Sequence, residues 1–125
     1  MSEELSPFLQ LTTTGRRSGQ PRQVELWYAQ RDGCFYVIAE FYTANWVLNL
    51  RSQPHVRFSV LEEEFDGVAR VVDASSDGAL NRDVQRLFRK KYGWSEGLVV
   101  ELRPAAQPKV SKKGWKRRLR FKRRG

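Results

Sequence analysis

A series of short segments in which apolar and polar residues alternate limits the folds open to this chain. A period of two residues is typical of strands with one buried face, and the glycine, proline and aspartate clusters between the segments favour turns. Because the connections are short, successive strands pair as antiparallel neighbours. Strands are predicted at 8–13, 23–30, 34–39, 56–60, 68–72 and 98–102.

The first three strands are expected to follow one another as antiparallel neighbours. The loop 15–21 is rich in turn formers and joins 8–13 to 23–30 as a hairpin. The turn 31–33 then returns the chain as 34–39, a run that is apolar on both faces. Such a run is typical of a strand in the middle of a sheet.

Two helices are predicted between the strands. The spacing of apolar residues predicts a short helix at 43–53, on which Trp46 and Asn49 face the same way. A longer helix is predicted at 80–91, ending at Gly93. Only one face of the longer helix is apolar, so we expect this face to lie on the sheet.

Six strands with two inserted helices predict a mainly β domain, in which an antiparallel sheet curls into a small barrel with a helix on its open side. A chain of 125 residues is long enough for one such domain. A barrel this small leaves apolar surface uncovered, and pairing with a second copy would bury that surface and create a cleft at the seam. A homodimer is therefore expected.

The net charge of +9 is concentrated at the C-terminal end of the chain. Residues 109–125 contain ten of the 23 basic residues and no acidic ones, which leaves 13 basic and 14 acidic residues in 1–108. We therefore divide the chain into a nearly neutral folded domain, 1–108, and a basic tail, 109–125. Ten like charges predict a tail that is disordered or only transiently helical, with a partner that is either an anionic membrane surface or a nucleic acid.

The remaining composition narrows the class of protein. The longest apolar run, Cys34–Ala39, is far too short to cross a bilayer, and the N-terminus lacks the pattern of a secretory leader, so a cytoplasmic location is expected. The single cysteine, Cys34, is interpreted as a buried structural thiol. His55 is the only histidine and is expected at the start of a strand, and the carboxylates 62–64 are expected to be solvated. No metal site is predicted.

Two sequence motifs lie in the first half of the chain. The first is Leu-Thr-Thr-Thr-Gly-Arg-Arg-Ser-Gly-Gln-Pro-Arg at 11–22, followed by Leu-Trp-Tyr at 26–28. The second consists of Trp46 and Asn49-Leu50, with Pro54 downstream. Together the two motifs resemble those of the deazaflavin-dependent nitroreductase family. Between the motifs, 40–45 replaces a longer segment that in this family commonly contains a basic residue.

The resemblance implies a split β-barrel of the kind found in flavin mononucleotide (FMN)-binding and pyridoxamine-phosphate-oxidase-like proteins. It further implies a homodimer that holds the deazaflavin coenzyme F420 in a groove, with FMN as the alternative cofactor. The implied activity is hydride transfer from the reduced coenzyme to a small electrophilic acceptor such as a nitroaromatic compound, a quinone or an enone. The alternative function is a non-enzymatic split-barrel module whose basic tail binds a polyanion.

The family's site residues are transferred position by position. The loop residues implied to bind the phosphate and acidic tail of the coenzyme are Arg16, Arg17, Ser18, Gly19 and Arg22. Arginine forks and backbone donors on such a loop suit phosphate and carboxylate oxygens. The residues implied to lie along the ring system or to close the pocket are Leu26, Trp27, Ala39, Glu40, Trp46 and Asn49. Tyr92 and Trp94 are further aromatic candidates.

Without the resemblance, a plainer interpretation of each residue is open. The loop would be an exposed hairpin tip with solvated arginines, Trp46 a core anchor and Asn49 a local capping partner. A reductase of this kind also needs a donor for the anion that develops on the acceptor. Among the tyrosines, Tyr42 is the predicted catalytic residue, because it lies in the segment beside the implied pocket.

Overall fold

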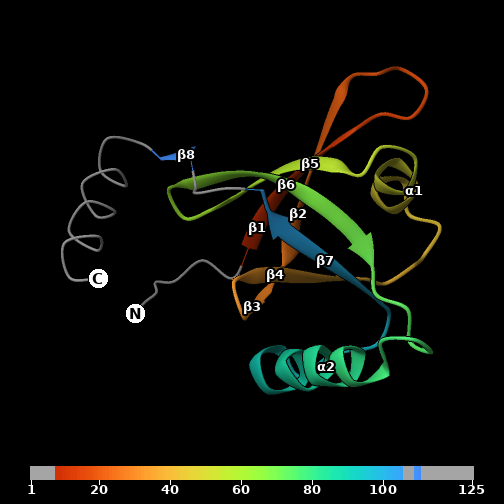
Figure 1. The fold of residues 1–125 in the computed structure, drawn as a ribbon, viewed down its shortest axis with the longest axis vertical. Coiled ribbons are helices and arrows are strands. Elements are labelled where there is room, and N and C mark those ends of the chain that lie inside the picture. Colours follow the sequence, from red (N-terminus) through yellow and green to blue (C-terminus); the bar gives the residue numbers. More distant parts are fainter. Residues whose placement is uncertain (1–7, 106–108, 111–125) are drawn as a thin grey trace.

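The computed structural model describes residues 8–105, together with the backbone of 109–110. These residues form one curled antiparallel sheet with two helices (Figure 1). The elements in chain order are β1 (Phe8–Thr14), β2 (Pro21–Trp27), β3 (Ala29–Arg31), β4 (Cys34–Ala39), α1 (Asn45–Ser52), β5 (His55–Val60), β6 (Glu63–Val71), α2 (Gly78–Tyr92), β7 (Leu98–Pro104) and β8 (Lys109–Val110). The mainly β fold class with inserted helices is confirmed, with eight described strands instead of six.

The strand order corrects the predicted succession of three neighbouring strands. The observed order is β2-β1-β5-β6-β7-β4-β3, with β8 added beside β6. β1 and β2 form the predicted hairpin, but β4 pairs with β7 and β3, not with β2. The predicted strand 23–30 breaks at Tyr28, because the backbone N–H and C=O of Tyr28 are hydrogen bonded to the Tyr92 hydroxyl instead of a neighbouring strand.

The sheet separates two apolar cores, and β4 contributes to both. Alternate residues of β4 face opposite ways, so Phe35 and Val37 enter the barrel interior while Tyr36 and Ile38 face α2. All six residues of β4 are buried, as its continuous apolar run indicates. The predicted central position is wrong, because β4 lies next to the edge strand β3, and its burial comes from the two cores that it separates. Cys34 is buried as predicted, and His55 begins β5 as predicted.

The helix α2 covers the outer face of β4 and β7 (Figure 1). Its apolar stripe buries Val84 and Phe88 completely, as expected for an amphipathic helix on a sheet. The helix ends at Gly93, whose φ of 74° places it in the left-handed region that terminates helices. The predicted stop is therefore confirmed.

A buried carboxylate lies at the edge of this second core. Glu101 on β7 is 2% exposed and accepts hydrogen bonds from the Tyr36 hydroxyl and the Arg70 guanidinium, both at 2.9 Å. Burial raises the pKa of Glu101, but the bonds from Arg70 and Tyr36 outweigh burial and leave that pKa below its usual value. Burial and the bond to Glu101 raise the pKa of Tyr36 far above its usual value. Glu101 is therefore ionised and fully paired.

The predicted division into a domain and a tail is only partly covered by the structure. Lys109–Val110 forms β8 and pairs with Glu63 and Glu64 of β6. The rest of the predicted tail, 111–125, lies outside the described residues. Its predicted binding to an anionic partner therefore stays a prediction. Among the described residues, no helix has the length and hydropathy needed to span a bilayer.

Candidate functional site

The loop between β1 and β2 is a compact turn. The Gly15 N–H donates to the Gln20 carbonyl at 2.8 Å, and the Gly19 N–H donates to the Gly15 carbonyl at 2.9 Å. Gly19 has a φ of 72°, and a Cβ on Gly15 would lie 2.6 Å from the Ser18 hydroxyl oxygen. The left-handed backbone of Gly19 therefore favours glycine, whereas a side chain at position 15 would require the Ser18 hydroxyl to move. The turn fixes the backbone that carries the arginines.

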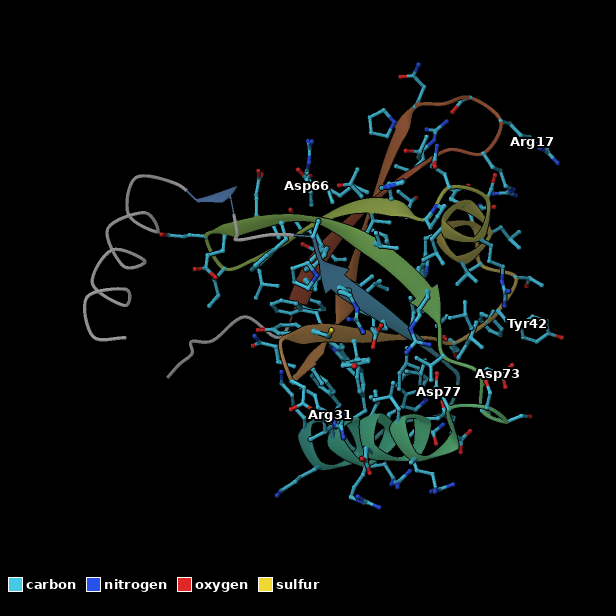
Figure 2. All side chains as sticks on the ribbon, in the orientation of Figure 1. Arg17, Arg31, Tyr42, Asp66, Asp73 and Asp77 are labelled. Atoms are coloured by element: carbon cyan, nitrogen blue, oxygen red, sulfur yellow. The ribbon has the colours of Figure 1, made fainter. Side chains whose placement is uncertain are left out.

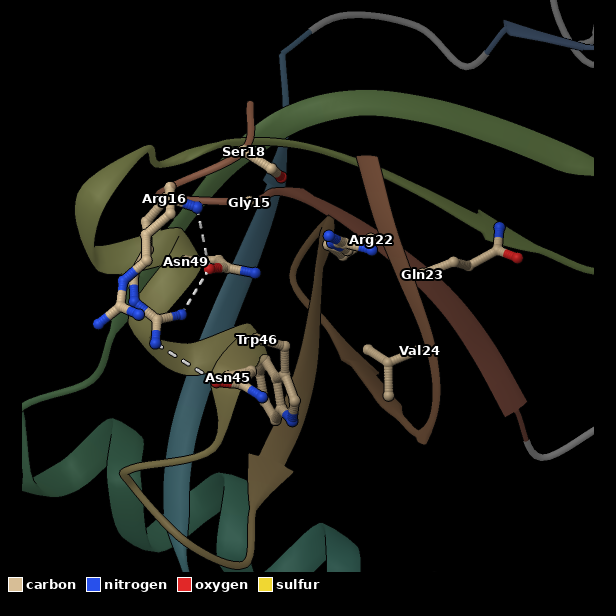
Figure 3. A pocket seen from close by; sticks show the side chains of 10 residues that line it. Gly15, Arg16, Ser18, Arg22, Gln23, Val24, Asn45, Trp46 and Asn49 are labelled. Carbon is tan, nitrogen blue, oxygen red and sulfur yellow. Dashed lines mark hydrogen bonds between the residues drawn. The ribbon is translucent and has the colours of Figure 1, made fainter. Parts of the chain in front are cut away.

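Asn49 of α1 holds this loop against the helix (Figure 3). Its Oδ1 accepts hydrogen bonds from the backbone N–H of Arg16 at 3.2 Å and from the Arg16 guanidinium at 2.8 Å. Its Nδ2 donates to the Thr13 hydroxyl at 3.2 Å, and the second guanidinium nitrogen of Arg16 reaches Asn45 at 3.3 Å. Because Asn49 is only 3% exposed, its amide can be satisfied only by these partners.

A polar cavity of about 680 Å³ opens between this loop, β2 and α1. Its lining contains three arginines and no carboxylate, so it is positively charged. Arg17 and Arg22 are exposed and make no ion pair with another described residue, and Figure 2 shows Arg17 directed away from the domain. The lining residues are Gly15, Arg16, Arg17, Ser18, Arg22, Gln23, Val24, Asn45, Trp46 and Asn49.

An aromatic cavity of about 560 Å³ lies next to the polar one. It opens beside the end of β4. The pairing between β3 and β4 ends at Tyr36, so Ile38 and Ala39 have no partner on β3. These two residues line the cavity together with Leu26 and Trp27 at the end of β2. Trp46 lines both cavities and is their common wall. The lining residues are Leu26, Trp27, Ile38, Ala39, Glu40, Phe41, Ala44, Trp46 and Trp94.

An aromatic stack sets the position of the Trp27 indole in this cavity. The rings of Trp27 and Tyr92 are 4.5 Å apart and nearly parallel, and Trp94 meets Trp27 edge-on at 6.3 Å. The Tyr92 hydroxyl donates to the Tyr28 carbonyl at 2.6 Å and accepts from the Tyr28 N–H at 3.1 Å. Burial raises the pKa of Tyr92 despite its bond to Tyr28, so the phenol is protonated at neutral pH.

Most of the predicted site residues come together around these two cavities. Trp46 and Asn49 line the polar cavity with the loop residues, while Leu26, Trp27 and Glu40 line the aromatic one. The exceptions are Gly19 and Tyr42. Gly19 lines a separate cavity of about 490 Å³ on the far side of the loop, and the Tyr42 side chain is 67% exposed and lines neither site cavity (Figure 2).

The sequence analysis missed several lining residues. Asn45 lies one helical turn before Asn49, and that spacing would have placed both amides on one face of α1. Gln23, Val24, Ile38 and Ala44 are neighbours of predicted residues and carry no separate signal. Among the described residues, no group of three or more histidine, cysteine or acidic side chains is arranged to hold a metal ion.

Solved structures with the same fold include proteins with different described functions. The haem storage protein HutZ from Vibrio cholerae is 21% identical, with a TM-score of 0.70 over 83% of this chain and 85% of HutZ. A candidate pyridoxamine 5′-phosphate oxidase from Listeria innocua is 15% identical, with a TM-score of 0.67 over 84% of this chain and 88% of that protein. A protein described as an F420 reductase is 18% identical, with a TM-score of 0.61 over 82% and 90%. These likenesses confirm the split β-barrel fold.

The family model for F420H(2)-dependent quinone reductases matches residues 3–94. This match spans β1 through α2 and therefore includes the loop, α1 and all the lining residues of both cavities. It also agrees with the deazaflavin-dependent family to which the two sequence motifs pointed. The chain belongs to the F420H(2)-dependent quinone reductase family.

Proposed function

We propose that the polar and aromatic cavities together hold the coenzyme, and that the chain uses them to pass a hydride from F420H2 to a small quinone. Membership of the family makes the chain an F420-dependent reductase with a quinone-type acceptor. The observation that supports this use of the cavities is their separation by charge: one is lined by three arginines, the other by aromatic rings, and they meet at Trp46. A ligand with an anionic tail and a flat ring system matches this arrangement.

The three arginines contribute differently to binding the anionic tail of the coenzyme. Arg16 is already bonded to Asn49 and Asn45, so its main contribution is to position the loop. Arg17 and Arg22 line the same cavity without an ion pair to another described residue. Their guanidinium groups are therefore the available partners for phosphate or carboxylate oxygens.

The aromatic cavity is suited to a flat, weakly polar ring system. Trp27, Trp46 and Trp94 present indole rings to it, and Trp27 is fixed by its stack on Tyr92. Rings held in this way offer apolar contact area and exclude water from the reacting atoms. When bound, the reduced deazaflavin supplies the hydride, and the protein supplies position and an apolar environment.

The source of the proton that completes reduction of a quinone is a separate question. The lining of the aromatic cavity contains no hydroxyl or imidazole side chain, and the nearby Tyr92 hydroxyl is engaged by the backbone of Tyr28. We therefore propose solvent as the proton source. The catalytic role predicted for Tyr42 remains a prediction, and it requires the exposed side chain to turn toward the cavity.

Titration of the purified protein with F420 and with FMN, followed by coenzyme fluorescence, tests the proposal. We expect saturable binding of F420 that weakens as salt is added, because arginine contacts to an anionic tail are screened. Single-turnover oxidation of bound F420H2 by a naphthoquinone then tests hydride transfer. Absence of saturable F420 binding to folded protein would contradict the proposal.

A homodimer is proposed from the exposed aromatic side chains around the aromatic cavity. Trp27 is 39% exposed, Phe41 64% and Tyr42 67%, and all three lie in or beside segments that line this cavity. A second copy that covered them would bury apolar area and narrow the opening. Light scattering that gives the mass of a single chain at micromolar concentration would refute the dimer.

A further inference from the structure

One charged side chain lines the aromatic cavity. Glu40 follows Ala39 at the end of β4, and every other lining residue is apolar. The Glu40 side chain is exposed and makes no hydrogen bond or ion pair with another described residue. The carboxylate therefore stands beside an apolar wall with no neutralising partner in the lining.

The backbone that carries Glu40 is fixed by a close approach of two segments. A Cβ on Gly97 would overlap the carbonyl oxygen of Ala39 and would lie 2.8 Å from a methyl group of Ile38. Gly97 also has a φ of 139°, which residues with a side chain rarely adopt. The segment before β7 thus packs directly on the end of β4, which fixes the backbone from which the Glu40 side chain projects at the rim of the cavity.

The two cavities consequently carry opposite charge. The charged groups that line the polar cavity are guanidinium groups, and the charged group that lines the aromatic cavity is the Glu40 carboxylate. Trp46 lies between them. A group bound in the aromatic cavity lies close to Glu40, whereas the arginines line the other side of the shared wall. At a separation of about 6 Å, and with an effective dielectric constant close to that of water, one like charge weakens binding roughly threefold, and a lower dielectric constant increases this factor.

We propose that Glu40 makes the aromatic cavity select uncharged acceptors over anionic ones. This inference rests on the proposed function, because hydride transfer requires the acceptor to lie against the coenzyme ring in the aromatic cavity. It names a property of this chain's own segment 40–45, which replaces a longer segment in the resemblance described above. An acceptor with a sulfonate or carboxylate would be disfavoured, and its uncharged parent would be accepted.

The test uses a matched pair of ligands, a naphthoquinone and the same naphthoquinone carrying one sulfonate. Saturable quenching of tryptophan fluorescence reports their binding to the coenzyme-free protein, since three tryptophans line the cavity. The variants are Glu40→Gln, Glu40→Lys and, as a control of equal net charge, Glu64→Gln, which removes an exposed carboxylate that lines neither cavity. F420 affinity is measured in parallel, and the ratio of kcat/KM for the two quinones follows.

In the unchanged protein we expect the uncharged quinone to bind roughly 3- to 10-fold more tightly than the sulfonate. Glu40→Gln should bring this ratio close to one, Glu40→Lys should invert it, and Glu64→Gln should leave it unchanged. High salt should reduce the ratio in the unchanged protein. F420 affinity, measured on the same variants, separates an effect on the acceptor from an effect on the coenzyme ring in the same cavity.

Three results would overturn the inference. One is a ratio that does not respond to either Glu40 variant, and another is an equal response to Glu64→Gln. The third is a Glu40 variant that loses F420 affinity while the quinone ratio stays constant, which would assign Glu40 to the coenzyme. Failure of F420 to bind at all would instead refute the proposed function, and quinone quenching would still decide the role of Glu40.

Discussion

The polar and aromatic cavities share one wall but are built in different ways. The polar cavity depends on directional hydrogen bonds, because Asn49 ties the β1–β2 loop to α1 and to Thr13, with a further bond from Arg16 to Asn45. The aromatic cavity depends on strand register and ring packing, since Trp27 rests on Tyr92 beside the free end of β4. Substitutions in the two cavities should therefore have different effects. In the polar cavity they remove charge or hydrogen-bond geometry, and in the aromatic cavity they remove packing.

The largest expected effect comes from removing the two available cations. Arg17→Ala combined with Arg22→Ala should weaken F420 binding about 100-fold, because charge-assisted contacts to anions are each worth about 1.5 kcal/mol or more. The melting temperature should hardly change, since neither side chain has an ion pair with another described residue. Fluorescence titration and thermal melts measure the two quantities. Unchanged F420 affinity in the folded double variant would contradict the binding role proposed for these two arginines.

A substitution at the centre of the hydrogen-bond network should affect both stability and binding. Asn49→Ala removes a buried amide that serves Arg16 and Thr13, so we expect a loss of about 2 kcal/mol in the free energy of unfolding. Coenzyme affinity should fall roughly 10-fold as the loop loses its anchor. Asn45→Ala, which removes only the longer bond to Arg16, is the matched control and should cost less. Equal effects of the two variants would contradict the anchoring role of Asn49.

On the aromatic side, the Tyr92 hydroxyl can be removed while the ring stays. Tyr92→Phe should cost about 1 kcal/mol of stability, because the bonds to the Tyr28 backbone are lost. F420 affinity should fall less than in Asn49→Ala, because the arginine side is intact, while KM for the quinone rises, since Trp27 rests on a less firmly held ring. Denaturant unfolding and steady-state kinetics measure these effects. A fall in F420 affinity as large as that of Asn49→Ala would erase the distinction between the two sides.

Acid should destabilise the fold at the edge of the second core through Glu101. The folded-state pKa of Glu101 lies below its usual value of 4.5, so its ionised form stabilises the fold at pH values above the unfolded pKa. This contribution is lost as the pH falls below 4.5 and through the lowered folded-state pKa. Glu101→Gln should therefore melt at a lower temperature than the unchanged protein at pH 7, and the gap should narrow in acid. A gap that stays constant with pH would show that Glu101 does not titrate as described.

The smallest effect is expected at Tyr42. Its side chain is 67% exposed and lines neither site cavity, so Tyr42→Phe should change kcat for quinone reduction by less than about twofold. Stopped-flow oxidation of bound F420H2 measures this step directly. A loss of tenfold or more, with stability unchanged, would support the catalytic role predicted from the sequence. It would also add a phenol to the aromatic side.

The sequence predicted local elements better than their assembly. The alternation in β1 and β5, the continuous apolar run of β4 and the stop at Gly93 are local signals, and the structure contains each of these elements. The strand order was wrong because the break at Tyr28 is caused by Tyr92, a partner 64 residues away. Period-two patterning contains no information about such a contact.

The candidate site could be predicted to a similar extent. Short motifs located the loop and α1, but they treated Arg16 and Arg17 as equivalent ligands. The contacts of Arg16 with Asn49 and Asn45 appear only when the loop and the helix are side by side in space (Figure 3). The exposure of Tyr42 likewise depends on the path of the connection to α1.

The common wall supplied by α1 has a consequence for how the site opens. A helix of eight residues is too short to be stable in water by itself. α1 is therefore stabilised by the burial of two of its own side chains, Val47 and Leu50. Local unfolding of this single segment would open both halves of the groove at once. We therefore expect coenzyme entry and product release to depend on the stability of this one short helix, which amide hydrogen exchange in 45–52 measures.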